Sequence, residues 1–226
     1  LLPIPAGIMN PYHAIIFVRA GTVLDTLDEL THSLAHIFRQ HGLPEKTSQE
    51  VRACLGYGYI GLIQRAVPDL PVAEQEQLAR EFKDWYGAHC AGHTCLYAGI
   101  HELLQALEGA GRQTAIVSNK GQAAVTTLHE EFFSGLVTFS LGESPLYQKK
   151  PAPDMVWEAL KRLGCAQEDA GYIGDSEVDK RTADNAGLDS ILVTWGFRDP
   201  AFLEALQPDY LVQTPQELQT LLLSGD

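Results

Sequence analysis

Short apolar stretches alternate with longer segments of helical periodicity along most of the chain. The stretches are rich in β-branched residues and are followed by small or polar ones; they cover residues 14–18, 114–118, 137–141, 171–173, 190–194 and 210–212. Strands with this pattern are buried on both faces, because helices cover both sides of a parallel sheet. The pattern therefore predicts an α/β fold built on a doubly wound parallel sheet.

The segment 26–96 departs from this rhythm, because it contains helical patterns and no predicted strand. Its first helix is predicted from apolar residues at helical spacing, namely Leu27, Leu30, Leu34, Ile37 and Phe38. Further helices are predicted at 48–54, 59–66 and 72–90. We expect this all-helical segment to form a cap inserted after the first strand of a core made of residues 9–25 and 97–226. The cap would cover the carboxyl edge of the sheet, where open α/β sheets bind ligands.

Composition narrows the class of protein. The chain has 226 residues, 45% of them hydrophobic, which suits one globular core domain with an insertion. A net charge of −13 opposes nucleic-acid binding, which needs clustered Lys and Arg. No apolar run approaches the roughly 20 residues that span a membrane, and the opening LLPIPAGI lacks the basic residues of a signal peptide. We therefore expect a cytoplasmic protein that starts at Met9 and has no nucleic-acid or membrane partner.

The chain has four cysteines, Cys54, Cys90, Cys95 and Cys165. None of their spacings matches a CxxC pair or a zinc site. We expect four free thiols in a reducing compartment. The thiolate rather than the thiol is the nucleophile, so a reactive cysteine needs a base nearby.

Four polar segments lie at the carboxyl ends of predicted strands: 18–22 (VRAGT), 118–120 (SNK), 149–154 (KKPAPD) and 174–179 (GDSEVD). Each alone is common, because a hydroxyl after a strand usually caps a helix and a lysine before a proline is usually solvated. All four in this order are specific, and the carboxyl ends of parallel strands meet at one edge of the sheet. We therefore expect the four segments to form a single site.

With these segments in this order, the chain resembles the haloacid dehalogenase (HAD) superfamily of hydrolases, and within it the phosphoglycolate phosphatase type. The resemblance runs from residue 12 over nearly the whole chain. It implies a HAD-like Rossmannoid core with a helical cap, and Mg²⁺ as cofactor. It also implies that Ser118 and Asn119 hold a phosphate group and that Lys150 neutralises it. By the same resemblance Asp175 ligates Mg²⁺ and Asp179 lies beside it.

The first segment departs from the family pattern, which is Asp-x-Asp-Gly-Thr. Val18 stands at the position of the nucleophile and cannot attack phosphorus, and Ala20 stands at the position of the acid/base and cannot transfer a proton. We expect no aspartyl-phosphate chemistry and weak or absent Mg²⁺ binding. Asp175 and Asp179 would then be a vestigial metal site.

The loss of these carboxylates also changes the expected partners of two cations, Arg19 and Lys150. Arg19 follows the first strand, and we expect it to pair with Asp175. Lys150 would lack its anionic neighbours, so that it either becomes a nucleophilic amine or swings toward solvent.

Two functional hypotheses follow. The unusual residues gather on one predicted pocket, a pattern that resembles an engineered or designed active site. A cysteine with a nearby histidine can attack an ester, so Cys54 and His32, both in the cap, form a candidate dyad for ester hydrolysis, with Cys95 beside His93 as a second pair. Alternatively, the protein is a catalytically dead pseudoenzyme that at most binds phosphate or a partner, with these histidines solvated and Cys54 packed in the core. In both cases we expect a small-molecule ligand in the cleft between cap and core.

Overall fold

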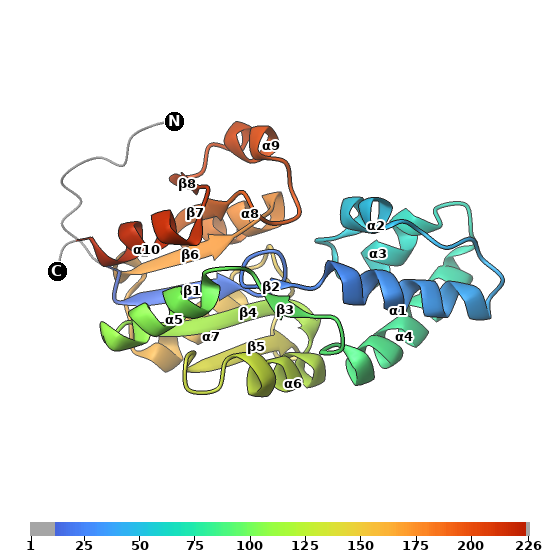
Figure 1. Cartoon of the computed structure of the whole chain (residues 1–226), viewed down its shortest axis with the longest axis horizontal. Helices are drawn as coiled ribbons and strands as arrows, with labels where there is room; N and C mark the ends of the chain where they lie inside the picture. The colour runs from blue at the N-terminus through green and yellow to red at the C-terminus, as the bar shows by residue number, and fades with distance from the viewer. Residues whose placement is uncertain (1–11, 225–226) are drawn as a thin grey trace.

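A central sheet of six parallel strands organises the protein (Figure 1). The structure is a computed structural model that describes residues 12–224. The strands, in the spatial order β5-β4-β1-β6-β7-β8, are β5 (Phe139–Glu143), β4 (Gln113–Gly121), β1 (Ala14–Val18), β6 (Ala170–Gly174), β7 (Asp189–Val193) and β8 (Tyr210–Val212). The first strand of the chain lies in the middle of the sheet, paired in parallel with β4 and β6. The predicted doubly wound α/β fold is confirmed.

Helices follow the strands and cover both faces of this sheet. They are α5 (Ile100–Gly109), α6 (Gln122–Phe132), α7 (Asp154–Leu163), α8 (Glu177–Ala186), α9 (Pro200–Ala205) and α10 (Pro215–Leu223), with a 3-10 turn, η1, at Gln167–Asp169. The apolar stripe of α7 is typical of them, because residues 155, 156, 159, 160 and 163 are buried against the sheet. α7 ends at Gly164, whose φ of 64° favours a residue without a Cβ.

The side chains of β1 alternate between two hydrophobic cores, as the two-residue period of a strand requires. Ile15 and Phe17 pack in a core that includes residues of α5, α6, α10 and the cap helices. Ile16 and Val18 pack in the other core, with residues of α7 and α8. The same alternation places Arg19, the next residue, on the side of Phe17.

Four helices lie beyond the carboxyl end of β1, to one side of the sheet (Figure 1), and are named the cap helices: α1 (Leu27–Gln40), α2 (Ser48–Cys54), α3 (Gly58–Ala66) and α4 (Val72–His89). Their positions follow the predicted helical patterns closely. A capping box between Thr47 and Glu50 begins α2. The boundaries of the cap at residues 26 and 96 stay a prediction, and residues 9–11 of the predicted core lie outside the described residues.

Two short strands that the sequence does not predict join the ends of the cap segment. β2 (Leu24–Asp25) and β3 (Cys95–Leu96) pair in antiparallel orientation where the chain leaves and re-enters the core. Two residues are too few to produce a recognisable alternation. The four cysteines are free of disulfide bonds. Within residues 12–224, no helix combines the length and apolar character needed to cross a membrane.

Candidate functional site

The carboxyl ends of β1, β4 and β6 border a cleft between the sheet and the cap helices, with about 720 Å³ of space that is partly open to solvent. The cleft is lined by all the core positions that the resemblance assigns to the site: Val18, Ala20, Ser118, Asn119, Lys150, Asp175 and Asp179. From the cap, Leu30, Leu55, Tyr59 and Leu62 face the same space. The four polar segments thus meet at one edge of the sheet, as expected for parallel strands.

A tight turn after β1 positions the first segment. The backbone N–H groups of Val23 and Leu24 donate to the Arg19 carbonyl at 3.1 and 2.9 Å. Gly21 has a φ of 81°, and a Cβ there would lie 2.2 Å from Asp175 Oδ2, so the turn needs a glycine. This turn presents the side chains of Val18 and Ala20 to the cleft, where they offer no nucleophile and no proton carrier.

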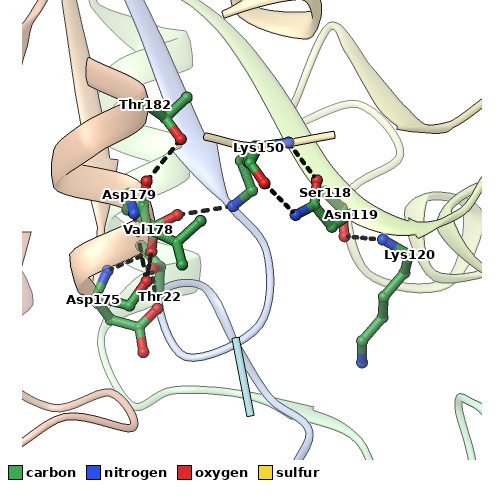
Figure 2. Close-up of polar contacts among 10 residues, drawn as sticks. Thr22, Ser118, Asn119, Lys120, Lys150, Asp175, Val178, Asp179 and Thr182 are labelled. Atoms are coloured by element: carbon green, nitrogen blue, oxygen red, sulfur yellow. Dashed lines mark hydrogen bonds and ion pairs between the residues drawn. The ribbon is translucent and has the colours of Figure 1, made fainter. Parts of the chain in front are cut away.

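Ser118 and Asn119 lie in the carboxyl-terminal part of β4, and Asn119 connects this strand to the segment that carries Lys150 (Figure 2). Asn119 Nδ2 donates to the Lys150 carbonyl at 3.1 Å, and the Lys150 N–H donates to Asn119 Oδ1 at 2.8 Å. Ser118 Oγ accepts a hydrogen bond from the Lys120 N–H at 3.2 Å, which leaves its hydroxyl proton available to a ligand. The reciprocal bonds hold the backbone of Lys150 beside the carboxyl-terminal part of β4.

Lys150 has an anionic neighbour, contrary to the expectation that it lacks one. Its Nζ lies 2.7 Å from Asp179 Oδ1, and the two side chains are 6% and 3% exposed. The second oxygen of Asp179 accepts from Ser176 Oγ at 2.6 Å and from the Asp175 N–H at 3.2 Å. The hypothesis of a free, nucleophilic Lys150 is therefore wrong, because Asp179 remains after the changes in the first segment.

Asp175 is buried beside Asp179, and its partner is not Arg19. Burial and the charge of Asp179 raise the pKa of Asp175 to about 7. Its Oδ2 accepts from the Phe197 N–H at 2.8 Å. Arg19 instead donates from Nη1 to the Ala124 carbonyl at 3.2 Å. The predicted Arg19–Asp175 pair is wrong, because strand alternation directs Arg19 toward the core of Phe17.

The structure does not bring Cys54 and His32 together. His32 is exposed, its Nδ1 lies 2.8 Å from the Asp28 carbonyl, and its ring stacks on His93. Cys54 does not line the cleft, and burial raises its pKa, which disfavours the thiolate. Among the described residues no hydrogen bond joins the two side chains. The hypothesis of a Cys54–His32 dyad gains no support from this arrangement.

The second candidate pair, Cys95 and His93, is arranged no better for thiol chemistry. His93 Nδ1 lies 2.9 Å from Glu29 Oε2, and its backbone N–H donates to the same oxygen at 2.7 Å. Cys95 is exposed in β3. The carboxylate of Glu29 therefore orients this imidazole, and no hydrogen bond in the described part of the chain links it to the thiol.

A polar contact between cap and core was not found by sequence reasoning. Arg198 pairs with Glu177 at 2.8 Å, and its Nη2 donates to the Leu55 carbonyl at 2.8 Å. The Tyr57 hydroxyl donates to the same Glu177. Burial alone would raise the pKa of Glu177, but the hydrogen bonds from Arg198 and Tyr57 outweigh it and lower the pKa to about 2. The only signal in the sequence is the position of Arg198 directly after Trp195-Gly196-Phe197, a segment that follows the strand predicted at 190–194.

Comparison with known proteins agrees with this fold. The family model of haloacid dehalogenase-like hydrolases matches residues 15–193. Phosphoglycolate phosphatase of Chromobacterium violaceum is 31% identical over 96% of this chain and 100% of its own. Phosphoglycolate phosphatase of Xanthomonas campestris pv. campestris is 30% identical over 91% of this chain and 94% of its own. The chain belongs to the haloacid dehalogenase-like hydrolase family, and the resemblance inferred from its motifs is confirmed at that level.

Solved structures give the same result. A candidate phosphoglycolate phosphatase from Lactobacillus delbrueckii subsp. bulgaricus superimposes with a TM-score of 0.90 at 34% identity, covering 95% of this chain and 99% of that one. A second structure of this type, from Haemophilus somnus, gives 0.84 at 25% identity, with 94% and 99% covered. The scaffold is therefore that of a HAD phosphatase.

The residues at the site fit Mg²⁺, the cofactor that the family resemblance implies, poorly. Mg²⁺ prefers an octahedron of oxygen ligands. Asp179 is already neutralised by Lys150, and one oxygen of Asp175 is engaged by the Phe197 N–H. Residues 12–224 hold no group of three or more His, Cys, Asp or Glu side chains placed to bind a metal. No step of the chemistry below is therefore assigned to a metal ion.

Proposed function

We propose that the cleft binds the phosphate group of a small molecule without transferring that group to a protein carboxylate. The observation that carries this proposal is the contrast within one cleft. Ser118, Asn119 and Lys150 line it as anion-binding groups, whereas Val18 and Ala20 occupy the end of β1. Phosphoryl transfer in this geometry needs a carboxylate nucleophile and an acid/base, and neither side chain supplies one.

The electrostatics of the cleft support an anionic ligand. The hydroxyl of Ser118 and the ammonium of Lys150 are donors of the kind that bind phosphate oxygens. A bound phosphate would share Lys150 with Asp179, which limits its affinity. The curated relatives are named phosphoglycolate phosphatases, which supports a phosphate ester as the ligand class. The ligand is thus a small molecule held between cap and core, rather than a nucleic acid or a membrane.

Binding and turnover are measured side by side to test this function. Isothermal titration with inorganic phosphate should give binding that Ser118→Ala weakens about fivefold, since one hydrogen bond contributes about 1 kcal/mol. Ser134→Ala, an exposed serine on the α6 side of the core, is the matched control and should leave binding unchanged. An aryl phosphate incubated with Mg²⁺ should not be hydrolysed.

The same preparation separates the other hypotheses. Mg²⁺-dependent phosphate release would contradict the proposal and show that Val18 and Ala20 do not prevent catalysis. If the protein hydrolyses an aryl ester and thiol alkylation abolishes this activity, the hypothesis of an engineered cysteine hydrolase is supported instead. The Cys54→Ala variant would then show whether Cys54 is the nucleophile. Absence of phosphate binding would contradict the proposal that the cleft binds a phosphate group.

A further inference from the structure

Arg19 and Lys120 interact electrostatically at the junction of β1, β4 and α4, and within residues 12–224 neither forms an ion pair with a carboxylate. Arg19 is 1% exposed, and its Nε and Nη2 have no hydrogen-bond partner among the described residues. Lys120 Nζ is 2.7 Å from the Tyr86 hydroxyl and 4.3 Å from the centre of its ring. Lys120 is half-buried. A buried positive charge next to a second, half-buried one is unfavourable unless one of them loses its proton.

The groups that face Lys120 do not restore its charge. Arg19 directly follows β1, Tyr86 lies in α4, Cys90 directly follows α4, and Glu29 lies in α1. Burial of Cys90 raises the pKa of its thiol, so that it stays neutral. The Glu29 carboxylate is engaged elsewhere, by the Ser33 hydroxyl at 3.2 Å and by His93 at 2.9 Å. Arg19 is therefore the dominant charge near the amine.

Lys120, rather than Arg19, is the group that gives up its proton and meets a ligand. A guanidinium stays protonated in proteins, whereas a lysine amine does not have to. Burial and the charge of Arg19 lower the pKa of Lys120 well below its usual range. Lys120 lines the cleft, and Arg19 does not. A neutral primary amine at the wall of a ligand cleft, beside a second cation, is the arrangement that makes a lysine nucleophilic.

We propose that Lys120 is an amine site that forms an imine with the carbonyl carbon of a small aldehyde or ketone that carries a phosphate group. The phosphate requirement rests on the proposed function above. The phosphate would lie at Ser118 and Lys150, close to the backbone of Lys120. Figure 2 shows the side chain of Lys120 extending away from Lys150 and Asp179. The carbonyl would therefore be at the end of the ligand remote from its phosphate.

The reaction is a condensation that needs no metal, oxidant or reductant. The lone pair of Nζ forms a bond to the carbonyl carbon, and the electron pair of the C=O π bond moves to oxygen. After proton transfer from nitrogen to oxygen the intermediate is a neutral carbinolamine. Protonation of its hydroxyl lets the C–O bond break with loss of water, while the nitrogen lone pair forms C=N and a proton is returned. The net change is amine plus carbonyl to imine plus water.

Arg19 and Tyr86 would act in this reaction as positioning residues. After burial, the charge of Arg19 is the next cause that lowers the pKa of the amine, and Arg19 exerts it without reaching the cleft. The Tyr86 hydroxyl holds Nζ in place, and burial raises its pKa, so that it keeps its proton. Replacing Arg19 by an apolar residue should therefore move the reactivity of Lys120 to higher pH, whereas a purely structural role would leave the pH dependence unchanged.

Trapping of the imine tests the proposal on the full chain. The protein is incubated at pH 7 with 2-phosphoglycolaldehyde or with glycolaldehyde in the presence of cyanoborohydride, and the labelled lysines are located by peptide mass spectrometry. Label on Lys120 should exceed label on the exposed Lys161 by about tenfold or more, because each unit of lowered pKa gives about tenfold more neutral amine. The phosphorylated aldehyde should react faster, and inorganic phosphate should slow it.

The results test the amine site at Lys120 and the phosphate-binding function separately. Equal labelling of Lys120 and Lys161 would overturn the amine site, even where phosphate binding by titration stands. Labelling of Lys120 by both aldehydes at one rate, without protection by phosphate, would keep the amine site and overturn the phosphate function. Lys120→Met should remove the label, and Lys161→Met is the matched control. Because the wild-type protein maps its own label, misfolding of the variant does not affect the test.

Discussion

Two pairs of cations lie at or near the cleft and differ in what surrounds them: Lys150 and Arg198, which line it, and Lys120, which lines it, with Arg19 behind it. Lys150 and Arg198 each face a carboxylate, Asp179 at 2.7 Å and Glu177 at 2.8 Å. Arg19 and Lys120 form no ion pair with a carboxylate anywhere in residues 12–224. The carboxylate beside a paired cation offsets its charge and holds it in position. A lysine beside an arginine, without such a carboxylate, is instead favoured in its neutral amine form.

The largest effect is expected from breaking the buried pair. Lys150→Met would leave the Asp179 carboxylate buried without its cation, and should lower the free energy of unfolding by about 3–5 kcal/mol. Lys149→Met is the matched control, because Lys149 pairs with Glu143 at the surface and is 50% exposed; its effect should stay below about 1 kcal/mol. Urea unfolding measures both, and equal losses would mean that burial does not distinguish the two pairs.

The opposite sign is expected for the unpaired cation. Arg19→Met should raise the free energy of unfolding by about 1–3 kcal/mol, since buried donors without partners cost about that much. The hydrogen bond to the Ala124 carbonyl is the only one that Arg19 loses among described residues. Thermal and urea unfolding of the variant measure the change. A loss of stability would show that Arg19 is well accommodated, and the contrast between the two pairs would fail.

A smaller effect is expected at the contact between cap and core. Glu177 has its pKa lowered from an ordinary value of 4.5 to about 2. Its folded-state pKa lies below the unfolded one, so its contribution to stability is present above pH 4.5 and is lost as the pH falls through about 2. Glu177→Gln should cost about 1 kcal/mol at pH 7, because glutamine still accepts hydrogen bonds.

The pH dependence distinguishes this contact from a general loss of packing. The difference in free energy of unfolding between wild type and Glu177→Gln should shrink as the pH falls from 5 toward 2. Tyr57→Phe, which removes only the hydroxyl, serves as the milder comparison. A difference that is constant with pH would show that the carboxylate charge of Glu177 does not stabilise the contact.

Much of the frame could be predicted from the sequence, because local periodicity determines it. Parallel strands buried on both faces produce short apolar stretches, and those at 14–18 and 210–212 coincide with β1 and β8. The strand pattern also predicts that Ser118, Lys150 and Asp175 lie close together, since parallel strands end at a common edge of the sheet. All three line the cleft. The β2–β3 pair was missed because two residues carry no pattern.

The chemistry of the site was harder to predict, because side-chain direction and partners depend on tertiary packing. Alternation along β1 was enough to place Arg19 on the side of Phe17, and following it would have excluded a pair with Asp175. The relation of Cys54 to His32 depends on how α2 packs on α1, which no local pattern contains. Lys120 stood in a recognised segment, but its importance comes from Tyr86 and Arg19, which are distant in sequence.

The backbone around Asp175 is interlocked at two glycines. A Cβ on Gly21 would lie 2.2 Å from Asp175 Oδ2, and one on Gly196 would lie 2.3 Å from the Gly21 carbonyl. The Trp195 indole donates to the Thr22 carbonyl at 2.9 Å and links the same two loops. These contacts constrain the shape of the loop and involve the side chain of neither Val18 nor Ala20. The conformation of this loop therefore does not depend on which side chains stand at positions 18 and 20.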